Sequence, residues 1–168
     1  NLIDAVHDNI GLMHRYISLR KKILGLDELH MYDIYTPLVK EIKMDVPYEE
    51  AKKIVADGLK PLGEEYQRVL QEGFNNRWID VYENENKRSG AYSWGAYGTH
   101  PYVLLNYHGN LDNVFTLAHE MGHAIHSYYS DKTQPYVYAG YKIFVAEVAS
   151  TCNEALLINH MLKTTDDR

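Results

Sequence analysis

Hydrophobic residues recur three or four positions apart over much of the chain, which is the spacing of α-helices that bury one face. The pattern predicts a helix over residues 2–24 that ends at Gly25, because glycine readily terminates helices. Further helices are expected over residues 47–73 with an interruption at Pro61, over residues 111–130, and over residues 138–163. The last two are apolar on more than one face, so we expect both to be buried.

The segment between the second and third predicted helices lacks the helical spacing of hydrophobic residues. Residues 90–98 are rich in glycine and aromatic side chains, and residues 102–107 form a short apolar run bounded by turn residues. Both stretches predict short strands joined by a tight loop. Asn110 or Asp112 can then cap the helix that follows. The sequence therefore predicts a mainly α-helical fold with a small β-hairpin or sheet beside the third helix.

Composition and charge limit the classes of function. The chain has 168 residues, one domain's length, and is 45% hydrophobic and 24% charged, as expected of a globular protein. Its net charge of -6 provides no basic field that would attract nucleic acid or an anionic membrane. The longest uncharged stretch, residues 89–111, is too polar for a transmembrane helix. The first 24 residues lack a signal-peptide pattern and Cys152 is the single cysteine, so we expect a cytoplasmic protein.

The strongest chemical feature lies inside the third predicted helix. His119, Glu120 and His123 form an H-E-x-x-H motif. Residues four apart lie on one face of a helix, so the two imidazoles can bind one tetrahedral Zn²⁺ at ~2.0–2.1 Å. Glu120 lies about 100° around the helix, which is too far to share the ion easily but within reach of a water bound to it. The motif therefore predicts a zinc hydrolase with Glu120 as the general base.

The setting of the motif supports this interpretation. Chance alone would produce H-E-x-x-H in about 3 of 100 chains of this composition, mostly on solvated faces. Here it lies in the most apolar helix, where burying two histidines and a carboxylate without partners would cost several kcal/mol. A bound metal removes that cost.

Gly122 lies between the two histidines, although glycine disfavours a helix by about 1 kcal/mol relative to alanine. Its missing side chain either lets another element approach the site or only permits tight helix packing.

A catalytic zinc needs a third protein ligand, and the sequence offers several candidates. Tyr129 occupies the position where extended forms of the motif carry a third histidine. His126 shares a face with His123, but three ligands from contiguous turns would not surround the ion easily, so we expect it to pack or to support a ligand. Glu147 and Glu154 lie two turns apart on one face of the last predicted helix. One is expected to bind the metal and the other to orient a histidine, and spacing alone does not say which.

Three stretches resemble the oligoendopeptidase F branch of the thimet oligopeptidase family of zinc metallopeptidases. They are Arg88-Ser-Gly-Ala-Tyr-Ser-Trp-Gly-Ala-Tyr-Gly98, His119-Glu-Met-Gly-His-Ala-Ile-His126 and Phe144-Val-Ala-Glu-Val-Ala-Ser-Thr-Cys-Asn-Glu154. The resemblance covers at least residues 74–163. It implies a helical zincin-type core with a small sheet beside the zinc helix, one Zn²⁺ per chain, and short peptides as substrates. It also implies that Glu147 is the third zinc ligand, which leaves Glu154 to orient a histidine.

Members of that family are much longer, and their tyrosine and histidine groups that stabilise the oxyanion lie downstream of the zinc helices. The chain begins at Asn1 and stops soon after the ligand helix. We therefore expect a single catalytic-region fragment, residues 1–168, with a helical lead-in over 1–73 and the sheet plus the two zinc-ligand helices over 74–168. The remainder of the parent enzyme is expected to be needed, because loss of an oxyanion donor costs ~10²–10³ in rate.

The expected activity is zinc-dependent endopeptidase cleavage of short oligopeptides. A zinc-bound water would attack the peptide carbonyl, and Glu120 would take its proton and pass it to the leaving amine. Strand addition to residues 91–98 is one way to bind the peptide backbone, and pairing of this strand only within the protein is at least as strong an alternative. Two other interpretations stay open: a thermolysin-like metallopeptidase of another family, and a helical module with a structural zinc or none.

Overall fold

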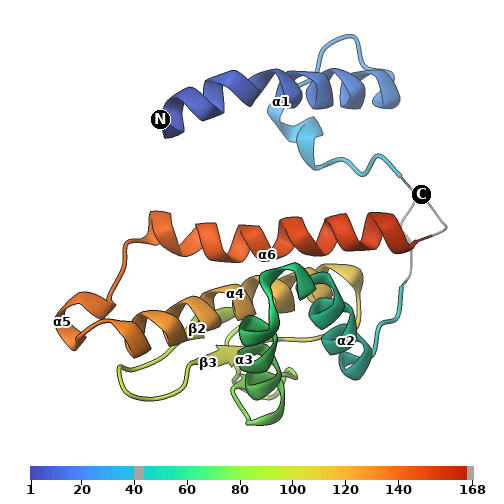
Figure 1. Cartoon of the computed structure of the whole chain (residues 1–168). Coiled ribbons are helices and arrows are strands. Elements are labelled where there is room, and N and C mark those ends of the chain that lie inside the picture. Colours follow the sequence, from blue (N-terminus) through green and yellow to red (C-terminus); the bar gives the residue numbers. More distant parts are fainter. Residues whose placement is uncertain (40–43, 166–168) are drawn as a thin grey trace. The chain divides into compact units, whose positions relative to one another are not determined.

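The structure, a computed structural model, describes residues 1–39 and 44–165 (Figure 1). Contacts divide the chain into two compact units, Asn1–Lys43 and Met44–Arg168. No helix among the described residues combines the length and the apolar character needed to cross a membrane. The residues that the sequence predicts to form the metal site all belong to the second unit.

The first unit contains helix α1 (Leu2–Leu24) and a short 3-10 helix, η1 (Met31–Tyr35). Gly25 ends α1 in the left-handed conformation with φ 66°, which confirms the predicted helix and its stop. The buried guanidinium of Arg20 donates hydrogen bonds to the carbonyl oxygens of Asp33 (2.9 Å) and Thr36 (2.5 Å). These bonds attach the segment around η1 to α1.

The second unit begins with α2 (Tyr48–Gly58), the 3-10 turn η2 (Lys60–Leu62) and α3 (Glu64–Asn75). Pro61 lies in η2, so the interruption predicted there is present. Both helices bury apolar side chains and pack against the long helices of the same unit. They therefore belong structurally with those helices, although the sequence pattern grouped them with a lead-in over residues 1–73. The functional division of the chain at residue 73 stays a prediction.

Three short strands form a sheet in the order β1-β3-β2. β2 (Tyr92–Trp94) and β3 (Tyr102–Leu104) are antiparallel, with Ser93 opposite Val103, and they confirm the two predicted strands. β1 (Ile79–Asp80) was not predicted, and it pairs in parallel with β3. Two residues are too few to show a strand's alternation, so only the long-range pairing defines β1. β2 is an edge strand that contacts the central helix.

Helix α4 (Leu111–Thr133) is the centre of the unit. The side-chain oxygen of Asn110 accepts a hydrogen bond from the backbone N–H of Asn113 at 2.8 Å, which makes Asn110 the cap. α4 lies between the sheet and helix α6 (Ile143–Thr164), and it contacts both (Figure 1). Its fully buried apolar side chains are Val114, Leu117, Ala118, Met121, Ala124 and Ile125. The predicted burial of this helix is confirmed.

The last predicted helix differs from expectation in extent and in burial. A short helix, α5 (Tyr136–Ala139), precedes it, and α6 itself begins at Ile143 rather than near residue 138. Its buried residues are Ser150, Asn153 and Leu157, while Ile143, Phe144, Val145 and Val148 are exposed. The expectation that this helix is buried on more than one face is wrong for the described chain. Among the described elements α6 packs mainly against α4 and α2, which cover one face.

Candidate metal centre

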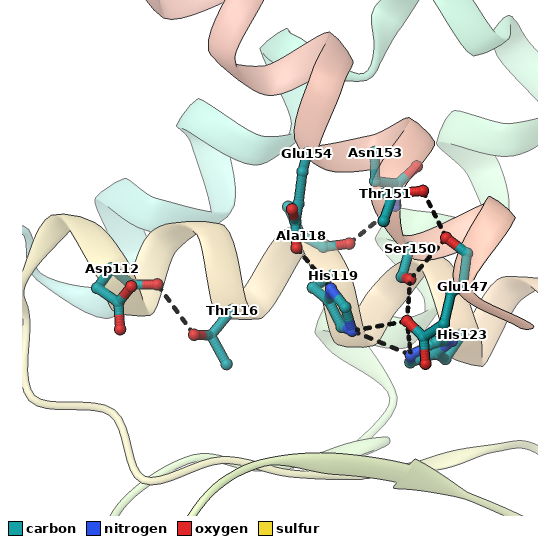
Figure 2. Close-up of polar contacts among 10 residues, drawn as sticks. All are labelled: Asp112, Thr116, Ala118, His119, His123, Glu147, Ser150, Thr151, Asn153 and Glu154. Atoms are coloured by element: carbon teal, nitrogen blue, oxygen red, sulfur yellow. Dashed lines mark hydrogen bonds and ion pairs between the residues drawn. The ribbon is translucent and has the colours of Figure 1, made fainter. Parts of the chain in front are cut away.

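The two histidines of the motif and one glutamate of α6 converge on a single point (Figure 2). His119 and His123 lie one turn apart on α4, and their Nε2 atoms are 3.1 Å apart. Oε2 of Glu147 is 3.6 Å from Nε2 of His119 and 3.7 Å from Nε2 of His123. Glu147 therefore stands where a third ligand is needed, and it comes from a different helix.

These distances suit a tetrahedral metal ion. Ligand atoms at ~2.0–2.1 Å from zinc in a tetrahedral arrangement lie about 3.3 Å from one another. The three atoms lie within 4.8 Å of one another, so small side-chain rotations would close the set. Among the described residues this is the one group of three His, Cys, Asp or Glu side chains that meets this criterion. Two imidazoles and a carboxylate leave a fourth position open, as catalytic zinc sites require.

Glu154 lies behind His119 on the side away from the convergence point (Figure 2). Its Oε1 is 2.5 Å from Nδ1 of His119, so the second imidazole nitrogen of this histidine already has a partner. A carboxylate at Nδ1 favours the tautomer that has its lone pair on Nε2, the atom facing Glu147 and His123. The two glutamates that the sequence pattern left interchangeable thus occupy different places.

Glu120 is buried although it carries an ionisable group. It is 6% exposed, and its Oε2 has no hydrogen-bond partner among the described residues. Burial raises the pKa of this carboxyl, and the charge of Glu147 raises it further, whereas His119 and the backbone N–H of Ser93 act in the opposite direction. Glu120 is therefore a buried carboxyl group with one unpartnered oxygen beside the His119, His123 and Glu147 cluster.

The surroundings of His123 favour the neutral form of its imidazole. Burial lowers the pKa of its imidazole, and the neighbouring His119 adds to this effect, while Glu147 opposes it. A lowered pKa keeps the ring neutral, and only a neutral imidazole nitrogen has a lone pair for a metal ion. The environment therefore favours ligation over protonation.

Gly122 explains how α6 comes so close to the motif. A Cβ atom built on Gly122 would lie 2.8 Å from Cα of Ser150 and 2.9 Å from the carbonyl oxygen of Ala149. Both contacts are with the backbone of α6, which cannot yield as a side-chain end can. The backbone of α6 packs directly against Gly122, which is compatible with both roles that the sequence left open for this glycine. The approach brings Glu147, three residues before Ser150, over the histidines.

A buried amide fixes how α6 sits along α4. Nδ2 of Asn153 donates to the carbonyl oxygen of Ala118 at 2.9 Å, and its Oδ1 accepts from the hydroxyl of Tyr66 at 3.0 Å. Asn153 is 1% exposed, so losing either bond would leave a desolvated polar group. Sequence reasoning did not single out Asn153, although a lone amide on the buried face of an apolar helix is a signal that could have found it.

Comparison with known proteins agrees with this geometry. The family model described as Peptidase family M3 matches residues 1–168. The chain belongs to peptidase family M3. The match replaces the thermolysin-like alternative, because it extends over the whole chain, well beyond the motif itself.

Two relatives of this M3 chain illustrate the similarity. It is 60% identical over 167 residues to oligopeptidase PepF of Bacillus subtilis, and the alignment covers 99% of the chain and 25% of that protein. It is 51% identical over 166 residues to the chromosomal oligoendopeptidase F of Lactococcus lactis subsp. cremoris, with 99% and 27% covered. The chain therefore spans about a quarter of the length of the curated relatives it matches.

Solved structures of peptidases also match the fold of this chain. The fold matches that of a Chlamydophila abortus protein with a TM-score of 0.86 and 50% identity, over 99% of the chain and 28% of that structure. The match to oligoendopeptidase-F of Enterococcus faecium has a TM-score of 0.54 and 34% identity, over 99% of the chain and 21% of that structure. The expected helical core with a small sheet is therefore confirmed.

A cavity of about 500 Å³ opens beside the ligand cluster. His123 and Glu147 line one part of it, and the segment after β2 lines another.

His126 is not one of the converging ligands. Its ring stacks on that of Tyr141 with 3.9 Å between centroids, and burial lowers the pKa of its imidazole. Sequence reasoning did not identify the cavity residues Asp131 and Tyr141, because nothing in their spacing ties them to the motif.

Proposed function

We propose that the natural protein containing this chain is a zinc-dependent endopeptidase that hydrolyses peptide bonds in short oligopeptides. His119, His123 and Glu147 would hold one Zn²⁺ per chain. The observation that carries the proposal is the convergence of three ligand atoms from two helices next to a buried carboxylate with a free oxygen. The names of the relatives, an oligopeptidase and an oligoendopeptidase, support the substrate class.

Each residue of the site has a separate role in the proposed reaction. Zinc, when bound, supplies the Lewis acidity that activates water for attack on a carbonyl. Glu120 accepts the proton of the attacking water and donates it to the leaving amine, and its raised pKa brings the carboxyl closer to the range in which one group can do both. Glu154 orients His119 through Nδ1, and the hydroxyl of Ser150 donates to Oε2 of Glu147 at 2.9 Å.

Edge strand β2 gives the peptide a place to bind. One of its edges pairs with β3, and no other strand of the described chain pairs with it. An extended peptide added along the other edge would make main-chain hydrogen bonds that do not depend on its sequence. Residues of and after β2 line the cavity beside His123, so this position would bring a scissile bond toward the metal.

We also propose a cytoplasmic location, supported by the unpaired, exposed Cys152.

Metal analysis and peptide cleavage, measured together, test the proposal. The complete natural protein is expected to contain about one zinc per chain, to lose both zinc and cleavage of a short fluorogenic peptide on chelation, and to regain both with one equivalent of Zn²⁺. Zinc binding with no cleavage of any short peptide would instead support a structural metal. Failure to bind zinc would overturn the assignment of the three ligands.

Replacing Glu154 with alanine is expected to weaken zinc binding about 10–100-fold, because His119 loses the carboxylate that fixes its tautomer and ring orientation. Competition with a zinc-binding dye measures the change. Glu85→Ala is the matched control, since Glu85 is exposed and lies outside the ligand cluster. Equal zinc affinity in the two variants would show that Glu154 does not position the ligand.

A further inference from the structure

Asp131 is a carboxylate in the cavity that the proposed chemistry does not use. It lies on α4, two turns beyond His123, and lines the same cavity of about 500 Å³. The side chain is partly buried, and no hydrogen bond or ion pair joins it to any described residue. A carboxylate that lines a cleft and has no partner within the protein is free to contact a ligand there.

The surroundings of Asp131 favour a cationic ligand. Four aromatic residues also line the cavity, namely Trp94, Tyr97, Tyr136 and Tyr141, and no lysine or arginine is among its described lining residues. The adjacent Lys132 is directed elsewhere, with Nζ 5.7 Å from the centroid of the Tyr128 ring. Aromatic faces attract cations, and a carboxylate adds a charged hydrogen-bond acceptor. Apolar and aromatic walls also suit the aliphatic stem of a basic side chain.

The cavity wall near Asp131 is held in place by several contacts. The hydroxyl of Tyr97 donates to the carbonyl oxygen of Gln134 at 2.9 Å, and its ring packs edge-on to that of Tyr136 with 5.5 Å between centroids. The hydroxyls of Ser127 and Tyr141 lie 2.6 Å apart. These contacts join the segment after β2 to the end of α4 and to the segment around α5. A preformed site of this kind binds without a large cost of ordering.

The distance along α4 between Asp131 and the candidate metal ligands predicts which residue of a bound peptide can reach Asp131. Asp131 follows His123 by eight residues, which corresponds to about 12 Å along a helix at ~1.5 Å per residue. An extended peptide advances ~3.3 Å per residue. For a peptide that runs along α4, a side chain that reaches Asp131 therefore belongs to a residue about three or four positions from the bond placed at the candidate ligands.

We propose that Asp131 is a specificity-determining residue that binds the ammonium or guanidinium group of a lysine or arginine side chain, about three or four residues from the scissile bond. The inference rests on the proposed peptidase function and adds a substrate preference to it. The free N-terminal ammonium of a peptide is also a cation that Asp131 could bind. The test must therefore distinguish it from a lysine or arginine side chain.

A positional peptide series tests the assignment in the complete natural protein loaded with zinc. The peptides are N-acetylated, C-amidated and neutral except for one lysine, which occupies each position in turn, and each is paired with a glutamine version. The wild type is expected to show kcat/KM about tenfold higher for lysine than for glutamine at a position near the third or fourth residue from the cleaved bond. Asp131→Asn should abolish the ratio, and Asp131→Lys should transfer the preference to a glutamate peptide. Equilibrium binding of the same peptides to a Glu120→Gln background should show the same ratios without turnover.

Asp112→Asn is the matched control, since it removes one negative charge from the other end of the same helix and lies outside this cavity. It should keep the wild-type ratio, which separates a local contact from a change in net charge. A lysine-to-glutamine ratio that is unchanged in Asp131→Asn would overturn the assignment while peptide cleavage persists. The same peptides are also measured without the N-acetyl group, and a preference that exists only for these peptides with a free N-terminus would overturn it as well. Absence of cleavage of every peptide by the wild type would instead contradict the proposed function.

Discussion

Replacing Glu120 with glutamine is expected to lower kcat for peptide hydrolysis by about 10³-fold in the complete protein, with zinc content unchanged. The amide keeps the size of the side chain but cannot accept the proton of the attacking water. Zinc should stay bound because the ligand atoms belong to His119, His123 and Glu147, whereas Glu120 is outside the group. Steady-state kinetics on a short peptide and metal analysis of the same preparation measure the two quantities.

Thermal unfolding of the metal-free proteins provides the control for this substitution. Oε2 of Glu120 is buried without a partner, so the carboxylate does not stabilise the metal-free fold through a hydrogen bond at that atom. The glutamine variant should therefore unfold at a temperature no lower than that of the wild type. A variant that loses zinc or stability together with activity would assign Glu120 a structural role and contradict the prediction.

The second large effect is expected at Gly122. Alanine is the better helix former by about 1 kcal/mol, yet its Cβ would lie within 3 Å of the α6 backbone. The two helices must separate, which moves Glu147 away from the histidines because Ser150, the residue in contact, lies one turn beyond it. We expect zinc affinity to fall at least 10-fold and the free energy of unfolding to fall by about 1–3 kcal/mol. Zinc titration and chemical denaturation measure these changes.

Gly11→Ala is the matched control for Gly122→Ala. Gly11 also lies in the interior of a long helix, α1, but nothing lies within 4 Å of the position that its Cβ would take. This substitution should leave zinc affinity unchanged and should not lower stability. If alanine at Gly122 behaved in the same way as alanine at Gly11, the close approach of α6 would not be what places Glu147.

The convergence of the two histidines of the candidate metal site could be predicted from the sequence because it depends on local structure. His119 and His123 need only one helical turn to meet, and the apolar residues around them predict both the helix and its burial. The assignment of Glu147 and Glu154 needed the family resemblance, since two carboxylates seven residues apart on one face are equivalent in a helical pattern. Their distances to different atoms of His119 separate them in the structure.

The parts that escaped prediction depend on contacts between distant segments. β1 exists only through its pairing with β3, and two residues carry no periodic pattern of their own. Asp131 becomes a cavity residue only when the segment after β2 and the segment around α5 fold beside the end of α4. The exposure of Phe144 and Val148 depends on which neighbours pack against α6, and an apolar pattern does not identify them.

The contacts that place α6 on α4 have a consequence for how this region can vary between related proteins. Gly122 against Ser150, Ala118 with Asn153, and His119 with Glu154 all connect one face of α6 to one helix. The opposite face, with Phe144 and Val148, takes no part in these contacts. Substitutions on that outer face are therefore expected to leave the spacing of the three candidate ligand atoms unchanged. The geometry of the candidate site therefore depends on α4 and on the face of α6 that packs against it.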